Sequence, residues 1–151
     1  MARFRYRMQN ILNIKLKMET QAKNEYASAN LALEEEKEKM NALIGRRQYY
    51  ENKVREYLSS DSLKLQSVGE AKRAIRSIEE QMRVQLNNVK KAEKVLEEKR
   101  IAMMELMKER KTQEILKEKA FEAFMQEENR AESKQIDELT SYLYGAKSKE
   151  E

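Results

Sequence analysis

Apolar residues recur along the first part of the chain at alternating steps of three and four. Between residues 22 and 57, nine of the eleven positions in this series are apolar, and most residues between them are charged or carry amides. A spacing of about 3.5 residues brings two side chains per heptad onto a partner helix. The pattern predicts a coiled-coil helix over about residues 4–58. The eleven positions are Ala22, Tyr26, Ala29, Leu33, Glu36, Met40, Leu43, Arg47, Tyr50, Val54 and Tyr57.

Upstream of this series the apolar residues are less regular, at Ile11, Leu12, Ile14, Leu16 and Met18. A second series of the same kind occupies the later part of the chain, and ten of its twelve positions are apolar. It consists of Val68, Ala71, Ile75, Ile78, Met82, Gln85, Val89, Ala92, Leu96, Lys99, Met103 and Leu106. Polar members of both series are expected to fix the register of the coiled coil. Beyond it we expect a slip of phase and then a renewed apolar face, through Arg110, Gln113, Leu116, Ala120 and Phe124.

Residues 59–67 contain the strongest break in these two patterns. Ser and Asp compete for backbone hydrogen bonds and favour caps and turns, and Ser59-Ser60-Asp61-Ser62 groups four of them. Ser67 and Glu70 have the spacing of a capping box. The second helix is therefore expected to begin at about residue 62 or at about residue 67. No glycine lies between Gly69 and Gly145, so it should continue to about residue 144, with a frayed tail over 145–151.

Two long helices joined by a short turn can pair in an antiparallel αα-hairpin. With the turn centred near residue 63, facing residues have numbers that add to about 125, so Tyr50 meets Ile75 and Leu43 meets Met82. Each pair joins one apolar series to the other. The predicted fold class is all-α, with residues 1–151 forming a single antiparallel coiled-coil hairpin that carries a C-terminal helical overhang.

The overhang is expected over about residues 122–144, where the first helix has ended. It keeps an apolar stripe at Phe121, Met125, Ile136, Leu139 and Leu143, with Phe124 beside it. An isolated helix of this kind is marginal in water. The stripe therefore predicts a partner protein, self-association, or contact with the first residues of the chain.

The chain lacks the side chains that most catalytic sites require. It contains no histidine and no cysteine, and no glycine-rich phosphate-binding loop is present. A thin coiled coil also lacks a concave pocket. We therefore expect no enzyme activity, metal, cofactor or small-molecule substrate. No apolar stretch is long enough for a membrane span and no cleavable signal peptide is apparent, so a cytoplasmic protein is expected.

The basic N-terminal run from Arg3 to Arg7 interleaves three arginines with Phe4 and Tyr6. Such a run can bind nucleic acid, lie on an anionic membrane surface, contact a protein or support the start of a helix. The net charge of +4 is too small and too scattered for a nucleic-acid-binding protein, so no nucleic-acid partner is expected. The membrane, protein-contact and structural interpretations remain open.

Several segments resemble the flagellar export protein FliJ family. The most specific are the opening FRYRMQNIL of residues 4–12 and the ENRAESKQIDE of residues 128–138. The segments at 15–19, 107–111 and 116–121 are also similar, and together the likeness covers nearly the whole chain. The resemblance implies a soluble component of the flagellar type III export apparatus, similar to the central stalk of rotary ATPases and peripheral to the cell membrane at the flagellar base.

The family resemblance also implies partners. These are a FliI-like export ATPase hexamer, an FlhA-like export gate and export chaperones. It places gate contacts near the turn, at Leu43, Ile44, Tyr49, Tyr50, Ile75, Ile78 and Met82. All of these except Ile44 and Tyr49 fall in the apolar series, where core packing is the alternative role. The stalk analogy places ATPase contacts at Arg5, Arg7, Arg130, Lys134 and Asp137. An injectisome stalk homologue and a purely structural coiled-coil spacer are the alternative functions.

Overall fold

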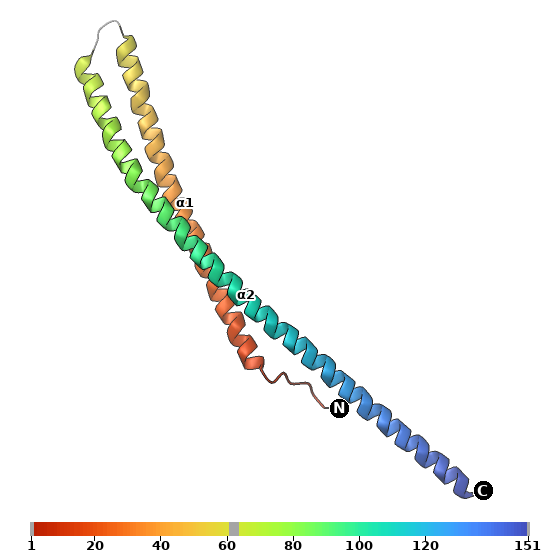
Figure 1. The fold of residues 1–151 in the computed structure, drawn as a ribbon. Coiled ribbons are helices and arrows are strands. Elements are labelled where there is room, and N and C mark those ends of the chain that lie inside the picture. The colour runs from red at the N-terminus through yellow and green to blue at the C-terminus, as the bar shows by residue number, and fades with distance from the viewer. Residues whose placement is uncertain (1, 61–63, 151) are drawn as a thin grey trace. The chain divides into compact units, whose positions relative to one another are not determined.

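Two long α-helices account for nearly all of the chain. The computed structural model describes residues 2–60 and 64–150, and over these residues it contains α1 (Gln9–Ser59), α2 (Leu65–Glu150) and no strand (Figure 1). The predicted all-α class is therefore confirmed. Asp61 and Ser62, which belong to the expected break, lie outside the described residues. The chain divides into two compact units, one over Gln21–Met104 and one that joins the residues up to Thr20 with those from Glu105 onward.

The helix bounds differ from those expected in three places. α1 begins at Gln9 rather than near residue 4, because Phe4 and Tyr6 pack against α2 from a segment without regular secondary structure. α2 begins at Leu65, between the two expected starts, so Ser67 and Glu70 lie inside the helix and form no capping box at its start. α2 also stays helical through the expected tail, as far as Glu150.

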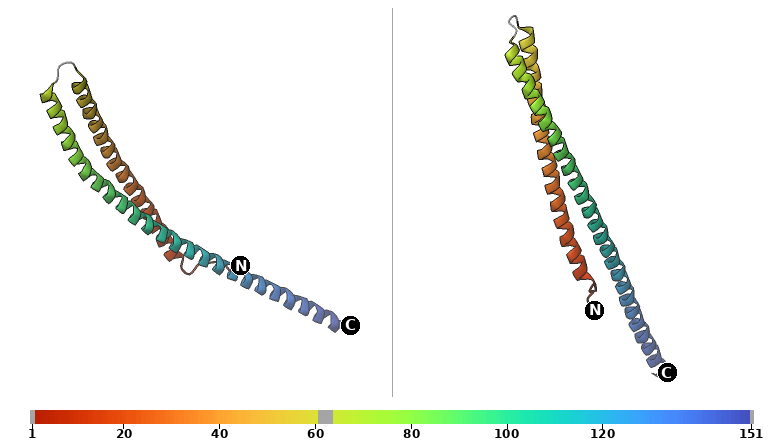
Figure 2. Two further views of the ribbon diagram at one scale, coloured as in Figure 1. Left: turned by 45° about the horizontal axis from the view of Figure 1, so that its top comes forward. Right: turned by 60° about the vertical axis from the view of Figure 1, so that its left-hand side comes forward.

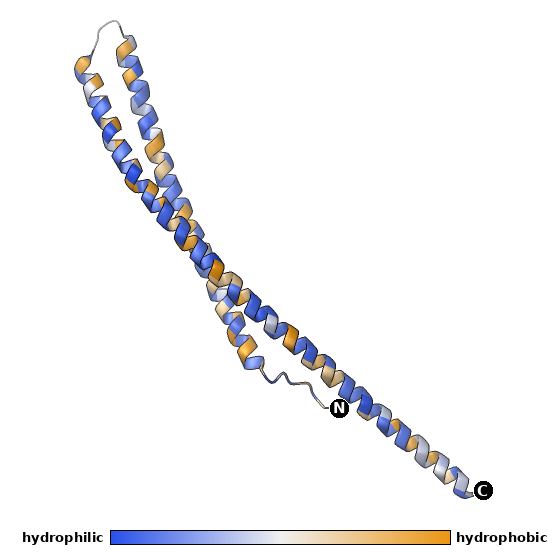
Figure 3. Ribbon diagram, viewed as in Figure 1, coloured by the Kyte–Doolittle hydropathy of each residue, from blue (hydrophilic) through white to orange (hydrophobic). Residues whose placement is uncertain are grey.

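In the unit over Gln21–Met104, the two helices run antiparallel and side by side (Figures 1 and 2). All positions of both predicted series in this unit are buried or half-buried, and Ile78 is 2% exposed. Blue and orange residues alternate along both helices in Figure 3, because the apolar seam is narrow and most of the other residues are polar. We call these inward-facing positions the seam.

Polar seam residues show which positions face each other. The Gln85 Nε2 donates to the Glu36 carbonyl oxygen at 2.9 Å and to Glu36 Oε2 at 2.5 Å. The Lys99 Nζ donates to Glu25 Oε2 at 3.2 Å. In both pairs the residue numbers add to nearly the expected total of about 125, which supports the expected register of the two helices; the expected centre of the turn, near residue 63, lies outside the described residues. Arg47, in contrast, pairs along its own helix with Glu51 at 3.7 Å.

In the second unit the seam continues in steps of three and four, so the expected slip of phase is wrong. Its α2 positions are Arg110, Gln113, Lys117, Ala120 and Phe124, all half-buried, whereas Leu116 is exposed. Its α1 positions are Leu12, Lys15 and Glu19. The apolar residues expected near this start, Ile11, Ile14, Leu16 and Met18, are exposed instead. Most of the polar residues at these seam positions have partners on the opposing segment: Arg110 bonds Glu19, Lys15 bonds Glu109, and Gln113 accepts from Tyr6.

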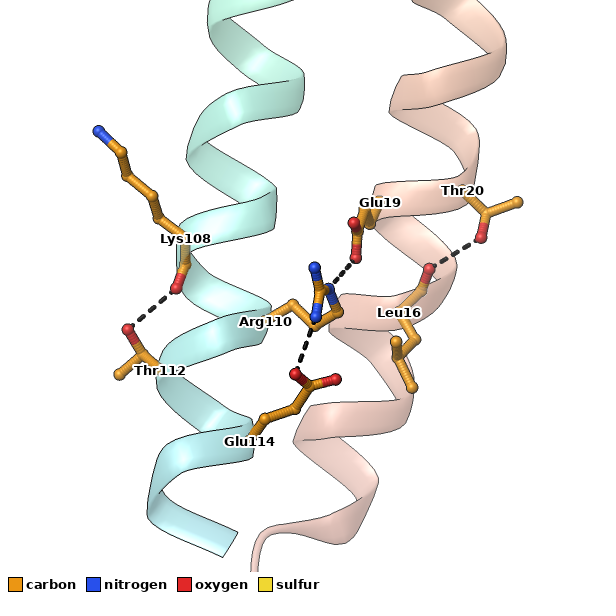
Figure 4. Close-up of polar contacts among 7 residues, drawn as sticks. All are labelled: Leu16, Glu19, Thr20, Lys108, Arg110, Thr112 and Glu114. Atoms are coloured by element: carbon orange, nitrogen blue, oxygen red, sulfur yellow. Dashed lines mark hydrogen bonds and ion pairs between the residues drawn. The ribbon is translucent and has the colours of Figure 1, made fainter. Parts of the chain in front are cut away.

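Arg110 joins the helices at the centre of this polar stretch (Figure 4). Its Nε donates to Glu19, which is 4% exposed, and its Nη1 donates to Glu114 at 2.8 Å. The hydrogen bond with Glu19 is the main cause that raises the pKa of Arg110, and Glu114 adds to it. The Lys15 Nζ bonds Glu109 at 2.7 Å nearby. Since a buried charge is costly without its partner, this contact strongly specifies the local register.

Replacing Arg110→Leu should lower the thermal midpoint by several degrees, because the buried Glu19 carboxylate loses its cross-helix donor. The double change Glu19→Leu and Arg110→Leu should recover most of that loss, since two apolar side chains suit a seam position. Thermal melts followed by circular dichroism measure both. A single variant as stable as the parent protein would show that the pair contributes little.

Candidate partner-binding surfaces

The seven residues predicted to contact an export gate divide by burial. Ile78 is almost fully buried, and Leu43, Tyr50, Ile75 and Met82 are half-buried in the seam. The remaining two lie off the seam and point into solvent: Ile44 is exposed, and Tyr49 is 56% exposed. Of the seven, only these two are exposed and therefore accessible to a partner without separation of the helix pair.

A groove of about 330 Å³ lies beside Tyr49. From α1 it is lined by Tyr49, Tyr50, Lys53 and Tyr57, and from α2 by Ser67, Glu70, Ala71 and Ala74. Large aromatic side chains on one helix thus face small side chains on the other, and this difference in size leaves the space open. We call it the tyrosine groove. Lys53 belongs to it but was absent from the sequence-based prediction, because the groove depends on which residues face each other across the seam.

Ring and charge contacts order the groove. The Tyr49 and Tyr50 rings meet edge to face with centroids 5.3 Å apart, and the Lys53 Nζ lies 5.5 Å from the Tyr49 ring centroid. Lys53 also pairs with Glu56 at 3.3 Å. That hydrogen bond is the first cause of the raised pKa of Lys53, followed by the charge of Glu56. Lys53 therefore remains cationic beside an exposed aromatic ring, an arrangement that favours contact with polar or acidic groups.

The first residues of the chain form a second feature, in the other unit. Residues 2–8, here called the strap, precede α1 and pack against α2; residues 2–6 have no regular secondary structure, and residues 7 and 8 form a turn. Phe4 packs against Phe121 and Phe124, with ring centroids 5.2 and 5.5 Å apart. The buried Tyr6 donates from its hydroxyl to Gln113 Oε1 at 2.9 Å. The aromatic residues of the basic N-terminal run therefore have a structural role.

The three arginines of the strap alternate with these aromatic residues and are exposed: Arg3, Arg5 and Arg7. They line a wide groove whose other wall includes Glu127 and Glu128 of α2. Arg5 and Arg7, two of the predicted ATPase contacts, therefore line the same groove. Arg130, Lys134 and Asp137 lie further along α2 and do not line this groove.

Beyond Glu128, α2 has no neighbour among the described residues. Every side chain from residue 129 to residue 149 is exposed, including those of Arg130, Lys134 and Asp137. Leu139 is 62% exposed. More than half of each of the other large apolar side chains in this stretch is also exposed, namely Ile136, Tyr142, Leu143 and Tyr144. The blue end of α2 in Figure 2 shows this stretch as a single helix. The strap covers only the first part of the expected overhang, at Phe121 and Phe124.

None of the described helices contains a stretch apolar and long enough to cross a membrane.

Comparisons with known proteins agree with this architecture. The family model described as Flagellar FliJ protein matches residues 4–149. No curated protein matches the chain. Among solved structures, a YscO homologue from Chlamydia trachomatis, CT670, has a similar fold with a TM-score of 0.71. The two chains are 24% identical, and the match covers 99% of this chain and 100% of the other. This structural likeness concerns the fold alone.

Replacing Phe4→Ala should release the strap, because the two ring contacts of Phe4 each stabilise by about 0.5–1.5 kcal/mol beyond simple burial. Trypsin should then cut after Arg5 and Arg7 about tenfold faster, since a loss of about 1.4 kcal/mol opens the strap tenfold more often. Mass spectrometry of the released N-terminal fragment measures the rate. Ile14→Ala, at an exposed position close by, is the matched control and should leave it unchanged. Equal rates for Phe4→Ala and the control would mean that Phe4 does not hold the strap.

Proposed function

Because the chain belongs to the FliJ family, we propose that it acts as the central stalk of an export ATPase hexamer and links that hexamer to the export gate. FliJ proteins are non-enzymatic components of type III export apparatus. The observation that carries the stalk proposal is the exposed single helix over residues 129–149. A stalk must present a slender element that a ring of subunits can surround, and a bare helix is about 10–12 Å wide.

The exposed stretch also bears on the alternative functions. A structural spacer would be expected to continue its seam to the end of the helix, whereas here Ile136, Leu139 and Leu143 are left without a facing helix among the described residues. Exposed apolar side chains at helical spacing suit the binding of another protein. For the injectisome alternative, the likeness to the YscO homologue supports a shared fold, and the family model supports the flagellar assignment.

Arg130, Lys134 and Asp137 are the proposed ATPase contacts on the exposed helix. All three side chains are exposed and take part in no ion pair within the described chain, so their charges are free to act on a partner. Arg5 and Arg7 on the strap are proposed to contact the same ATPase. They point outward because Phe4 and Tyr6 anchor the strap from the other side.

Ile44 and Tyr49 are the proposed gate contacts, together with Lys53 in the tyrosine groove. The other five residues predicted for the gate are proposed to act indirectly, by packing the seam beneath this surface. We also propose a cytoplasmic location at the membrane face of the flagellar base, where the ATPase and gate would be within reach. Export chaperones are further candidate partners.

Titrating this chain into the cognate export ATPase tests the stalk role. We expect ring formation and faster ATP hydrolysis, both saturating near one chain per hexamer, because a central stalk is shared by all subunits of a ring. Hydrolysis assays combined with light scattering measure rate and assembly together. An ATPase whose rate and oligomeric state do not respond would exclude the stalk role.

Charge reversal tests the proposed ATPase contacts on the exposed helix. Arg130→Glu with Lys134→Glu should weaken ATPase binding about tenfold or more, because like charges would then face each other at the interface. Lys90→Glu with Lys94→Glu is the matched control, since these exposed residues have the same spacing on α2. Calorimetric titration gives the affinities. If both pairs of changes weaken binding equally, the effect is not specific to the exposed helix.

A further inference from the structure

The part of the chain around the tyrosine groove carries a local excess of positive charge. Residues 45–77, here called the basic section, contain eight Lys and Arg against four Asp and Glu. The rest of the chain contains 23 basic and 23 acidic residues, so it is neutral overall. The basic section therefore has a net charge of +4 and includes the tyrosine groove. The first 18 residues, with five basic and no acidic side chains, form a separate basic stretch.

Most of these cations have no partner within the described chain. Arg47 pairs with Glu51, and Lys53 pairs with Glu56. The other six basic side chains are exposed and take part in no ion pair among residues 2–60 and 64–149. They are Arg46, Arg55, Lys64, Lys72, Arg73 and Arg76. Because these like charges repel one another when the helices pair, they do not stabilise the fold.

Exposed apolar and aromatic side chains accompany the cations. Leu58 and Leu65 are more than half exposed, as is Tyr49 at the rim of the tyrosine groove. Tyr and Arg are enriched at the centres of protein interfaces, where a ring fills a pocket and a guanidinium bonds a carboxylate. Here three tyrosines already surround a groove large enough for one entering side chain.

We propose that the basic section binds an acidic protein surface, with an apolar or aromatic side chain of the partner entering the tyrosine groove. The proposal rests on the function above, in which the export gate contacts this part of the chain, and it specifies the chemistry of the gate surface. The exposed cations steer the partner during association, and the groove holds it once bound.

The spread of the cations along the helices favours a protein over a lipid surface. Arg46 and Arg55 are about 14 Å apart along α1, and Leu65 and Arg76 are about 16 Å apart along α2, at 1.5 Å per residue. An anionic membrane that met the helices at the turn would leave Arg46 and Arg76 beyond the Debye length of about 8 Å. A protein surface that lies along the helices can reach cations over the whole length of this span.

Removing three of these charges tests the proposal. Lys72→Gln, Arg73→Gln and Arg76→Gln together should lower the association rate constant with the gate's cytoplasmic domain about tenfold at low salt. The dissociation rate should change little, and the salt dependence of association should flatten. Lys90→Gln, Lys91→Gln and Lys94→Gln form the control, because these exposed residues lie on α2 with identical spacing and remove the same charge. Surface plasmon resonance at several salt concentrations gives both rates, and circular dichroism checks the helices.

The outcomes separate this proposal from the proposed function. Suppose that the parent chain binds the gate. If the basic-section variant binds equally fast, or if both triple variants bind more slowly to the same extent, the acidic-partner proposal is overturned and the gate linkage stands. No binding by the parent chain would reject the gate linkage, and the acidic-partner proposal with it. Vesicles of phosphatidylglycerol and phosphatidylcholine provide a further arm. If the vesicles bind the parent chain, and the basic-section variant loses vesicle binding but keeps gate binding, the partner is a lipid surface and the proposal is wrong.

Discussion

The three- and four-residue spacing of inward-facing side chains is the constraint on which the rest of the structure depends. Long helices are marginal in water unless they bury an apolar stripe, and each helix here has only one such stripe. The seam is so narrow that few of the described side chains are nearly inaccessible to solvent, among them Ile78 at 2% and Leu12 at 4% exposed. Most other side chains face outward, so this chain can offer long surfaces to partners but no enclosed site for chemistry.

A narrow apolar seam specifies the register of the two helices weakly, because apolar side chains pack in several registers. The polar residues within the seam favour one register, because each has a particular partner. Gln85 bonds both the backbone and the side chain of Glu36, and Arg110 bonds the buried Glu19. A shift by one heptad would keep apolar residues facing apolar residues but would break both contacts. Buried polar pairs are a known means of fixing register in coiled coils, at some cost in stability.

The sequence was sufficient to predict that two helices pair and that they run antiparallel, because both predictions depend on the periodicity of the apolar residues. Every seam position predicted between Ala22 and Leu106 is buried or half-buried, and facing pairs such as Glu25 and Lys99 agree with the expected turn. The slip of phase was inferred because Arg110 and Gln113 are polar, but polarity does not remove a residue from a seam when it has a partner across it. The start of α1 was misplaced because Phe4 and Tyr6 have tertiary partners more than one hundred residues away.

The candidate surfaces were predicted less completely, for related reasons. The exposure of Ile44 and Tyr49 followed from the heptad positions, whereas the tyrosine groove requires knowledge of which small residues of α2 lie opposite the aromatic residues of α1. A windowed count of charge along the sequence would have located the basic section. The averaged net charge of the whole chain concealed it.

The contacts of the strap also determine at which stage of synthesis and folding the strap can pack against α2. Phe4 is synthesised more than one hundred residues before its partners Phe121 and Phe124. Contacts between residues so distant in sequence form late, since the intervening chain must first be brought together. Helix pairing from the turn brings these ends together, so the strap closes last. A nascent or truncated chain lacking Phe121 and Phe124 therefore keeps its aromatic and basic strap open to proteases, and closure of the strap marks a chain that has been synthesised past Phe124.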